Sequence, residues 1–350
     1  MLELLMSTAI ALIVIGAAVG AFKDGVAMNE VATQMADSTL NLRSGTNLLV
    51  TDLMQVGRGI PTGGISIPLA SAGATAIPRP SPSGASYFFD NTTATTLSAV
   101  TTGAGLGPTV AGRATDIVTL LMGDAILDEY LGQPLQVNVS TTAGLVPKLA
   151  VDGSSFSVGA STGWIAGDPL NGRAPVKPGD LMLFTNPNGS TAMQTVTRVD
   201  TSNVYFEATI GDTFNLNQRA VTAGSITQIL GTVLTAQRVL MYMYYVDASA
   251  GNPPRLMRRL NFFAGQALAG IVDFLELSYD VVDGTTNPTN LRDLPYTAAG
   301  VTYSANLIRK ANVHLGVRSE VMSTRQHDYL RNRASTVVSL RNLAFVDRYR

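Results

Sequence analysis

Cysteine is absent from the 350-residue chain, and charged residues are scarce. Without cysteine the protein has no disulfide, no thiolate metal site and no cysteine nucleophile. Asp, Glu, Lys and Arg make up 14% of the residues, against roughly a quarter in ordinary soluble domains. The formal net charge of −1 argues against a general nucleic-acid binder, which needs a basic surface. Alanine, glycine, serine and threonine dominate long stretches in place of the charges.

A long uncharged run near the start contrasts with this composition. After Glu3 no charged residue occurs until Lys23, which leaves the nineteen residues 4–22 without charge. As a helix this run would span about 28 Å, close to the thickness of a bilayer's hydrocarbon core. A signal peptide would carry positive charge before the run, and a buried core helix would be apolar all round at an extreme terminus. We therefore predict a membrane-spanning segment over residues 1–22.

The amphipathic pattern after this run predicts that the helix continues over residues 23–57. Apolar residues recur at helical spacing, with polar residues between them, until residues 57–61 end the pattern. One helix of roughly 80 Å is favoured, with Gly25 and Gly45 as weak points. The alternative is a separate anchor and core helix with a break near Gly25. The residues expected to pack the helix on a sheet are Met28, Val31, Met35, Leu42, Leu49, Leu53 and Val56.

The remainder, residues 58–350, is predicted to form one β-rich globular region. Prolines and glycines over about residues 60–112 predict a loop-rich insertion. Asn188-Gly189 predicts a hairpin turn, and alternating or aromatic-rich runs predict an antiparallel sheet. The fold class is therefore α+β, with a long N-terminal helix on a large antiparallel β-rich region. The expected strands cover residues 116–122, 135–140, 149–151, 181–185, 192–199, 204–208, 225–230, 238–246, 256–263, 274–282, 312–318 and 336–341.

The start of the chain resembles the type IV pilins and pseudopilins. Glu3-Leu4-Leu5-Met6-Ser7 heads an apolar helix, and Leu2-Glu3-Leu4-Leu5 is similar to the I-E-L-L of the family's processed N-terminus. The glutamate stands third here and fifth in the family. The resemblance implies leader removal, N-terminal methylation and an assembly or docking role for Glu3. A carboxylate within a bilayer costs several kcal/mol unless it is paired, and in a filament it pairs with a neighbouring subunit's α-amine.

Several later stretches resemble the PilW-like minor pilins, in the same order along the chain. They cover residues 113–120, 177–183, 268–280, 308–318 and 338–343. The resemblance implies a pilin-type globular region, other pilin subunits as partners, a role in pilus assembly, priming or tip function, and no enzymatic activity. It also implies a bacterial inner-membrane location before assembly, and then an extracellular pilus or a periplasmic pseudopilus. The alternatives are a type II secretion pseudopilin and, from another class, a membrane-anchored adhesin or binding domain that never assembles.

A formal G-x-S-x-G pattern at residues 159–163 raises the hypothesis of a hydrolase. Ser161 would be the nucleophile, with His314 or His327 as its base. A nucleophile elbow needs a buried strand before it and a helix after it, and the flanking residues read as loops. The sequence therefore argues against this activity.

Two surface patterns raise hypotheses about external ligands. The last fifty residues hold nine basic and three acidic residues, which would suit a DNA ligand, but their spacing is irregular. An adhesive surface for a host ligand could use Trp164, Tyr242, Tyr244 and Tyr245, although strand aromatics more often pack in the core. Both ligands stay minor hypotheses beside the pilin resemblance.

One acidic loop near Gly284 holds oxygen ligands at short spacing. Such ligands suit Ca²⁺, and the resemblance adds that some pseudopilins bind calcium near this end. The loop lacks the EF-hand pattern, and Asp and Asn in loops usually make turns. No cofactor is expected, and calcium is the weaker hypothesis. The five candidate ligands are Asp280, Asp283, Asn287, Asn290 and Asp293.

Overall fold

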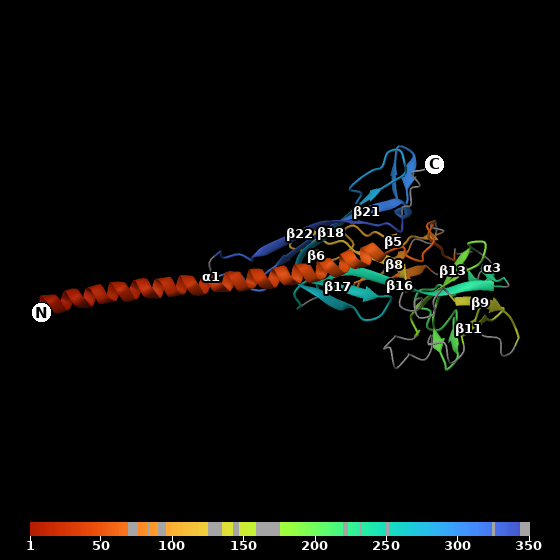
Figure 1. Ribbon diagram of the computed structural model, residues 1–350, viewed down its shortest axis with the longest axis horizontal. Coiled ribbons are helices and arrows are strands. Elements are labelled where there is room, and N and C mark those ends of the chain that lie inside the picture. The colour runs from red at the N-terminus through yellow and green to blue at the C-terminus, as the bar shows by residue number, and fades with distance from the viewer. Residues whose placement is uncertain are drawn as a thin grey trace.

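A single long helix, α1 (Leu2–Gln55), projects from a β-rich body (Figure 1). It runs through Gly25 and Gly45 without a break, which confirms the continuous helix predicted from the sequence. Its 54 residues correspond to about 80 Å. The computed structural model describes residues 1–68, 76–82, 84–89, 96–124, 135–142, 147–158, 176–219, 223–231, 233–249, 252–323 and 326–343.

The helix ends where Gly57 turns the chain toward the sheet. Gly57 has a φ of +79°, a left-handed conformation that glycine adopts without a steric penalty. Its N–H donates a 2.9 Å hydrogen bond to the carbonyl oxygen of Leu121. A Cβ at this position would lie 2.6 Å from Leu343 Cδ2. Glycine therefore allows both the turn and the close contact with the C-terminal segment.

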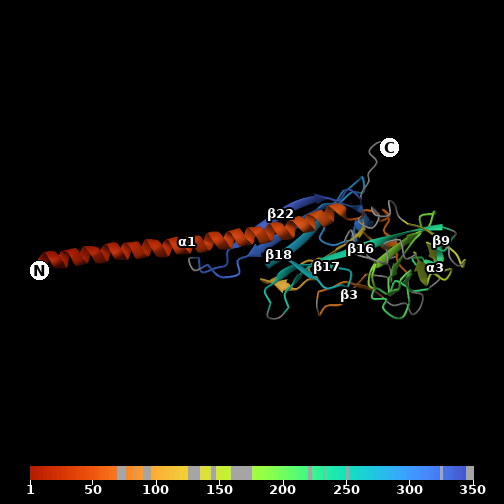
Figure 2. The same ribbon diagram turned by 60° about the horizontal axis from the view of Figure 1, so that its bottom comes forward.

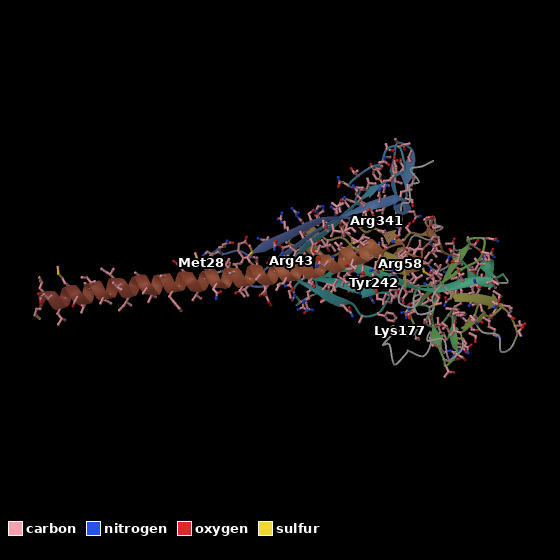
Figure 3. All side chains as sticks on the ribbon, in the orientation of Figure 1. Met28, Arg43, Arg58, Lys177, Tyr242 and Arg341 are labelled. Carbon is pink, nitrogen blue, oxygen red and sulfur yellow. The ribbon has the colours of Figure 1, made fainter. Side chains whose placement is uncertain are left out.

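The buried face of α1 is shorter than the sequence predicted. Met28 and Met35 are 58% and 45% exposed, and Val31 is half-buried. The body only partly covers this part of the helix, where Gln34 is half-buried, and Ser38 is the first fully buried helical residue; Figure 3 places Met28 at the margin of the body. The packing role predicted for Met28 and Met35 is therefore wrong within this single chain. The stripe members that do lie in the core are Leu42, Leu49, Leu53 and Val56.

Most strands belong to one 14-stranded sheet among the described residues. All its pairings are antiparallel except that of β9 with β10. The central strand β16 pairs with β8, β9, β12 and β17, and the path continues through β18 and β21 to β22. The strands are β5 (Val100–Thr101), β8 (Val118–Gly123), β9 (Leu135–Val139), β10 (Lys148–Leu149), β11 (Ser155–Ser157), β12 (Leu181–Thr185), β13 (Thr191–Thr195), β14 (Arg198–Val199), β15 (Asn203–Tyr205), β16 (Val233–Asp247), β17 (Arg255–Leu260), β18 (Gln266–Val281), β21 (Ile308–Arg318) and β22 (Arg331–Ser339).

Several two-stranded pairs lie outside this sheet, and most of their strands fall in the predicted loop-rich stretch. A 3-10 turn, η1 (Ala305–Leu307), precedes β21. The two-stranded pairs are β1 (Ile65–Ser66) with β4 (Thr96–Leu97), β2 (Ile77–Arg79) with β3 (Tyr87–Phe89), β6 (Thr109–Val110) with β7 (Arg113–Ala114), and β19 (Tyr296–Ala298) with β20 (Val301–Tyr303).

The body has a main core under α1 and a second core at the end farthest from the helix tip (Figures 1 and 2). In the second core the ring of Phe184 packs edge-on against Phe156 and Phe206, with centroid separations of 5.8 and 5.5 Å. β16 contributes Leu234 and Ala236 to the second core and its later residues to the main one. One continuous strand thus joins the two.

One predicted strand is wrong and another is divided. Residues predicted as the strand 225–230 form a short helix, α3 (Ile226–Ile229). Ile226 and Ile229 are both buried, a spacing that places them on one helical face. The predicted strand 192–199 is split into β13 and β14. The hairpin at Asn188-Gly189 joins β12 to β13 as predicted.

Candidate functional site

The first half of α1 is a bare apolar rod. Its most apolar 18-residue window has a mean hydropathy of 2.3, and none of that window is buried by the rest of the chain. By length and composition the helix can cross a membrane. Glu3 lies in the first turn and is exposed. So much contiguous apolar surface is far more than a soluble monomer exposes, so this segment needs lipid or protein around it.

The second half of α1 is fixed to the sheet by a buried carboxylate. Asp52 Oδ2 accepts hydrogen bonds from Arg258 Nε at 2.7 Å and from the Tyr244 hydroxyl at 2.5 Å. Asp52 Oδ1 accepts a third bond from Arg258 Nη2 at 3.1 Å. The Arg258 guanidinium also lies 3.7 Å from the centroid of the Tyr242 ring. Three strand residues on β16 and β17 thus converge around one helical acid.

Burial controls the protonation of this cluster. It raises the pKa of the Tyr244 hydroxyl far above its ordinary value, and the neighbouring Asp52 charge adds to the increase. Burial alone would lower the pKa of Arg258, but its hydrogen bonds to Asp52 and its electrostatic interactions with Asp52, Tyr244 and Tyr242 together outweigh this and raise the pKa. Arg258 therefore stays charged and Tyr244 stays a hydrogen-bond donor across the physiological range.

A close approach between α1 and the sheet occurs at Gly45. A Cβ there would lie 2.9 Å from Ala269 Cβ and 3.0 Å from Leu256 Cδ2. The absence of a side chain lets the helix backbone approach β17 and β18. Gly45, predicted as a weak point of the helix, is a packing point.

Two hydrogen bonds join α1 to the C-terminal part of the chain. Asn332 Nδ2 donates to Thr39 Oγ1 at 3.0 Å, and Asn342 Nδ2 donates to the carbonyl oxygen of Val56 at 3.1 Å. Both chain positions advance from the first bond to the second, so α1 and β22 run side by side in the same direction, as Figures 1 and 2 also show.

Comparisons with protein-family profiles, curated proteins and solved structures found no match. The structure itself establishes an α+β protein with a long apolar N-terminal helix and a large body of antiparallel sheet. This helix is compatible with a membrane anchor.

The candidate calcium ligands take part in hydrogen bonds within the body. Asp283 accepts backbone hydrogen bonds from residues 285, 286 and 287, and these bonds, that from Asn287 first, lower its pKa. Asp280 accepts from the Asn290 N–H, and Asp293 accepts from Thr102 Oγ1. Among the described residues no group of three acidic, histidine or cysteine side chains is placed to hold a metal.

The described residues give little support to the hypotheses of an aromatic adhesive surface and of a hydrolase. Tyr244 and Tyr245 are buried and Tyr242 is half-buried, so the three do not form an exposed adhesive surface. His314 lies within β21 opposite Glu276 and Ser335. The G-x-S-x-G stretch, with Ser161, and Trp164 lie outside the described residues.

The C-terminal basic residues have several different environments. Arg318 and Arg331 both pair with Asp273, and Arg331 also pairs with Asp328. Arg333 lies over the Phe274 ring. Arg325, Arg348 and Arg350 lie outside the described residues. The described arginines are therefore partly used in ion pairs within the body.

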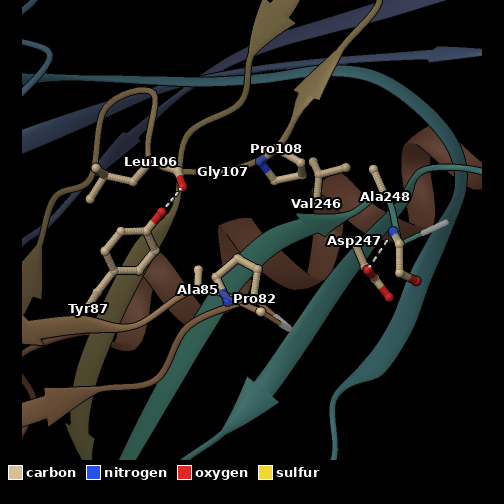
Figure 4. Close-up of a pocket in the computed structure, with 11 residues that line it drawn as sticks. Pro82, Ala85, Tyr87, Leu106, Gly107, Pro108, Val246, Asp247 and Ala248 are labelled. Atoms are coloured by element: carbon tan, nitrogen blue, oxygen red, sulfur yellow. Dashed lines mark hydrogen bonds between the residues drawn. The ribbon is translucent and has the colours of Figure 1, made fainter.

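Two of the surface hollows on the described part of the body adjoin the β2–β3 pair or α1. One, of about 270 Å³, is formed by the β2–β3 turn, the segment 106–108 and the end of β16 (Figure 4). Its one tyrosine, Tyr87, donates its hydroxyl proton to the carbonyl oxygen of Leu106. The other, of about 500 Å³, lies where α1 leaves the sheet, between Asn41, Arg255 and Arg318. Neither gathers groups with catalytic geometry.

Sequence reasoning missed the buried polar contacts that fix the fold. Asp52 is one of the polar residues between the apolar positions of the predicted stripe, and only its spacing of three residues from Leu49 and four from Val56 indicates burial. Arg79, 4% exposed, lies in the predicted loop-rich stretch. It donates to the carbonyl oxygens of Thr101 and Thr102 and to Thr119 Oγ1, and burial lowers its pKa to about 10.

Proposed function

We propose that this protein is a structural subunit of a type IV pilus-like filament, acting as a minor pilin in assembly, priming or tip function. One observation carries the proposal. A single unbroken helix has a bare apolar half and a half fixed to the sheet. A simple anchor needs only the apolar half, because a flexible linker can join it to any domain. A rigid connection instead sets the position of the body on a bundle of packed helices.

The resemblance of residues 2–7 and the PilW-like stretches to pilins supports the same proposal. In this proposal residues 1–22 lie in the inner membrane before assembly and pack against other pilin subunits afterwards. Glu3 is the docking carboxylate, and it pairs with the terminal amine of a neighbouring subunit. The bare apolar surface of the helix supports this location, since lipid and a helix bundle both cover it.

The test uses Glu3→Ala and Glu3→Gln in the native cells, with Glu320→Ala on the exposed surface of the body as the matched control. We expect both Glu3 variants to remain in the membrane fraction but to fall at least tenfold in sheared surface filaments, since an unpaired amine costs roughly 2 kcal/mol or more. The control is expected to assemble normally. Normal assembly of both Glu3 variants would overturn the docking role of Glu3, whereas a wild-type protein that never enters a filament would overturn the proposal and favour an anchored binding domain.

A second measurement distinguishes a surface pilus from a periplasmic pseudopilus. A surface pilus releases the protein on shearing, whereas a type II secretion pseudopilus keeps it in the periplasm. The N-terminal mass of the purified protein tests the processing that the resemblance implies. A methylated N-terminus near Glu3 would support the prepilin pathway, and an unmodified Met1 on membrane-retained protein would contradict it.

A further inference from the structure

The last strand of the sheet, β22, has a free edge. It pairs with β21 on one side, in a register that runs from Lys310 opposite Ser339 to Arg318 opposite Arg331 without a bulge. Among the described residues no other strand pairs with it. The strand has nine residues and no proline. Long straight edges of this kind are templates for another strand, and proteins usually protect them.

Two hydrogen bonds fix which residues of β22 point to that edge. The Ser319 N–H donates to the Leu330 carbonyl oxygen, and the Leu340 N–H donates to the Arg309 carbonyl oxygen, both at 2.8 Å. Hydrogen-bonded pairs alternate along an antiparallel ladder, so the even-numbered residues of β22 bond to β21. The odd-numbered residues direct their N–H and C=O groups away from it. Consistently, the Arg333 N–H is taken up by the neighbouring Asn332 side chain.

The same odd-numbered residues form the exposed row of side chains on β22. Its charged protection covers only the start of the strand, at Arg331 and Arg333. The row then continues through Ser335, Val337 and Ser339, and Val337 is 61% exposed. The uncharged part of the strand includes the β-branched residues Thr336, Val337 and Val338, which favour strand pairing. Among the described residues, this edge is therefore unpaired and carries charge only at its start.

A second copy of this chain is a poor occupant of the edge. Two copies that share it through a two-fold axis would pair their β22 strands antiparallel. Because α1 and β22 run in the same direction, the two apolar half-helices would then leave the dimer at opposite ends. They could not enter one membrane or one polar filament. This elimination rests on the proposed function, whereas the open edge does not.

Charge indicates the chemistry of the remaining occupant. Arg331 is held by Asp273 and Asp328, but Arg333 has no carboxylate partner among the described residues, and its guanidinium lies over the Phe274 ring. Lys310, exposed opposite Ser339, adds a further positive charge beside the edge. An acidic group opposite Arg333 and an apolar group opposite Val337 would match the row.

We propose that the free edge of β22 accepts an extended segment of a partner protein by strand addition. The segment carries a carboxylate opposite Arg333 and an apolar residue opposite Val337, four positions apart. Main-chain hydrogen bonds supply affinity, and the alternate side chains supply specificity.

The test measures peptide binding to the full-length protein in detergent micelles by fluorescence anisotropy. The probe is a labelled nine-residue peptide of alternating valine and threonine, nine being the length of β22, with a glutamate four residues from its central valine. A matched peptide has lysine in place of glutamate. We expect the glutamate peptide to bind several-fold more tightly than the lysine peptide. Equal binding of the two, or no binding of either, would overturn the proposal.

Two variants locate the binding at β22. Ser335→Pro removes a free edge N–H without removing a bond to β21, and it should weaken binding about tenfold; Ser335→Thr keeps the N–H and should bind normally. Arg333→Gln should weaken binding of the glutamate peptide about two- to fivefold, whereas Arg198→Gln on β14 should not. Unchanged binding in Ser335→Pro and Arg333→Gln would contradict the proposed location.

A third variant tests the excluded occupant. The chain has no cysteine, so Ser335→Cys introduces a single thiol at the middle of the edge. We expect no cross-linked dimer with a short bis-maleimide reagent. Efficient cross-linking would show that a second copy occupies the edge, which would overturn the proposal of a different partner. The result of the Glu3 test would be unaffected.

Discussion

Asp52 and Arg258 hold α1 to the sheet from positions 206 residues apart in the sequence, with Arg258 Nε 2.7 Å from Asp52 Oδ2. A second bond joins Arg258 Nη2 to Asp52 Oδ1 at 3.1 Å. This fork geometry fixes direction as well as distance, since both nitrogens must align with both oxygens. The Tyr244 hydroxyl completes the same carboxylate. The pair therefore fixes how the helix lies on β16 and β17.

Asp52→Ala is expected to lower the free energy of unfolding of the body by about 3 kcal/mol, because it leaves the Arg258 charge largely buried without a partner. The double variant Asp52→Leu/Arg258→Leu should recover most of this loss, since it removes both charges. Urea denaturation in micelles, followed by circular dichroism, measures both values. A single variant that loses under about 0.5 kcal/mol would contradict the fixing role.

Gly45→Ala is expected to destabilise the body by about 1–2 kcal/mol. The new Cβ would lie 2.9 Å from Ala269 Cβ, and the resulting overpacking outweighs the gain of up to about 1 kcal/mol in helix propensity. Gly25→Ala is the matched control, because a Cβ there meets nothing within 4 Å; it should be neutral or stabilising. Thermal unfolding of both variants distinguishes the sites, and equal effects would refute the close approach at Gly45.

Asp180 provides a prediction about pH. Burial raises the pKa of its carboxyl above the ordinary value, against the opposing effects of the Lys177 N–H and Arg238. Asp180 therefore loses its proton at a lower pH in the unfolded chain than in the folded one. Its contribution to stability falls as the pH rises from about 4 through the raised pKa of the folded state. Asp180→Asn removes the ionisable group and with it this loss of stability, which is about 1.4 kcal/mol if burial raises the pKa by one.

The measurement compares the two proteins by urea denaturation at pH 4, 5, 6 and 7. The variant should gain stability relative to the wild type as the pH rises across this range. Asp180 Oδ2 accepts the Lys177 N–H at 2.9 Å, a bond that an asparagine oxygen can keep. A relative gain as the pH falls would contradict the assignment.

The sequence predicts those features of the fold that depend on local pattern. The extent of α1 follows from the uncharged run, the helical spacing and the glycine at its end, and the turn at Asn188-Gly189 follows from turn chemistry. The strand predicted at residues 225–230 failed because two isoleucines three residues apart suit a helical turn as well as a strand. Short apolar runs do not distinguish the two.

The packing face and the buried polar contacts depend on tertiary structure. In the sequence the apolar stripe continues from Leu42 back toward the N-terminus as far as Met28. In the structure the sheet covers Leu42 but leaves Met35 and Met28 exposed, and no local sequence pattern marks that limit. The partner of Asp52 lies on β17, and only the assembled sheet brings it near. Glu3 is a candidate through resemblance alone, because the single chain places it on an exposed helical tip.

Disulfide and cross-linker scanning of the apolar half-helix tests the central claim most directly. The chain lacks cysteine, so single cysteines at Ile10, Leu12 and Ile13 report on three different faces of the helix. The proposed filament predicts cross-links from all three faces to neighbouring subunits in the sheared filament fraction, and none from the exposed body position Ile210. Cysteines that stay uncross-linked on every face, in protein found only in the membrane, would contradict assembly through this helix.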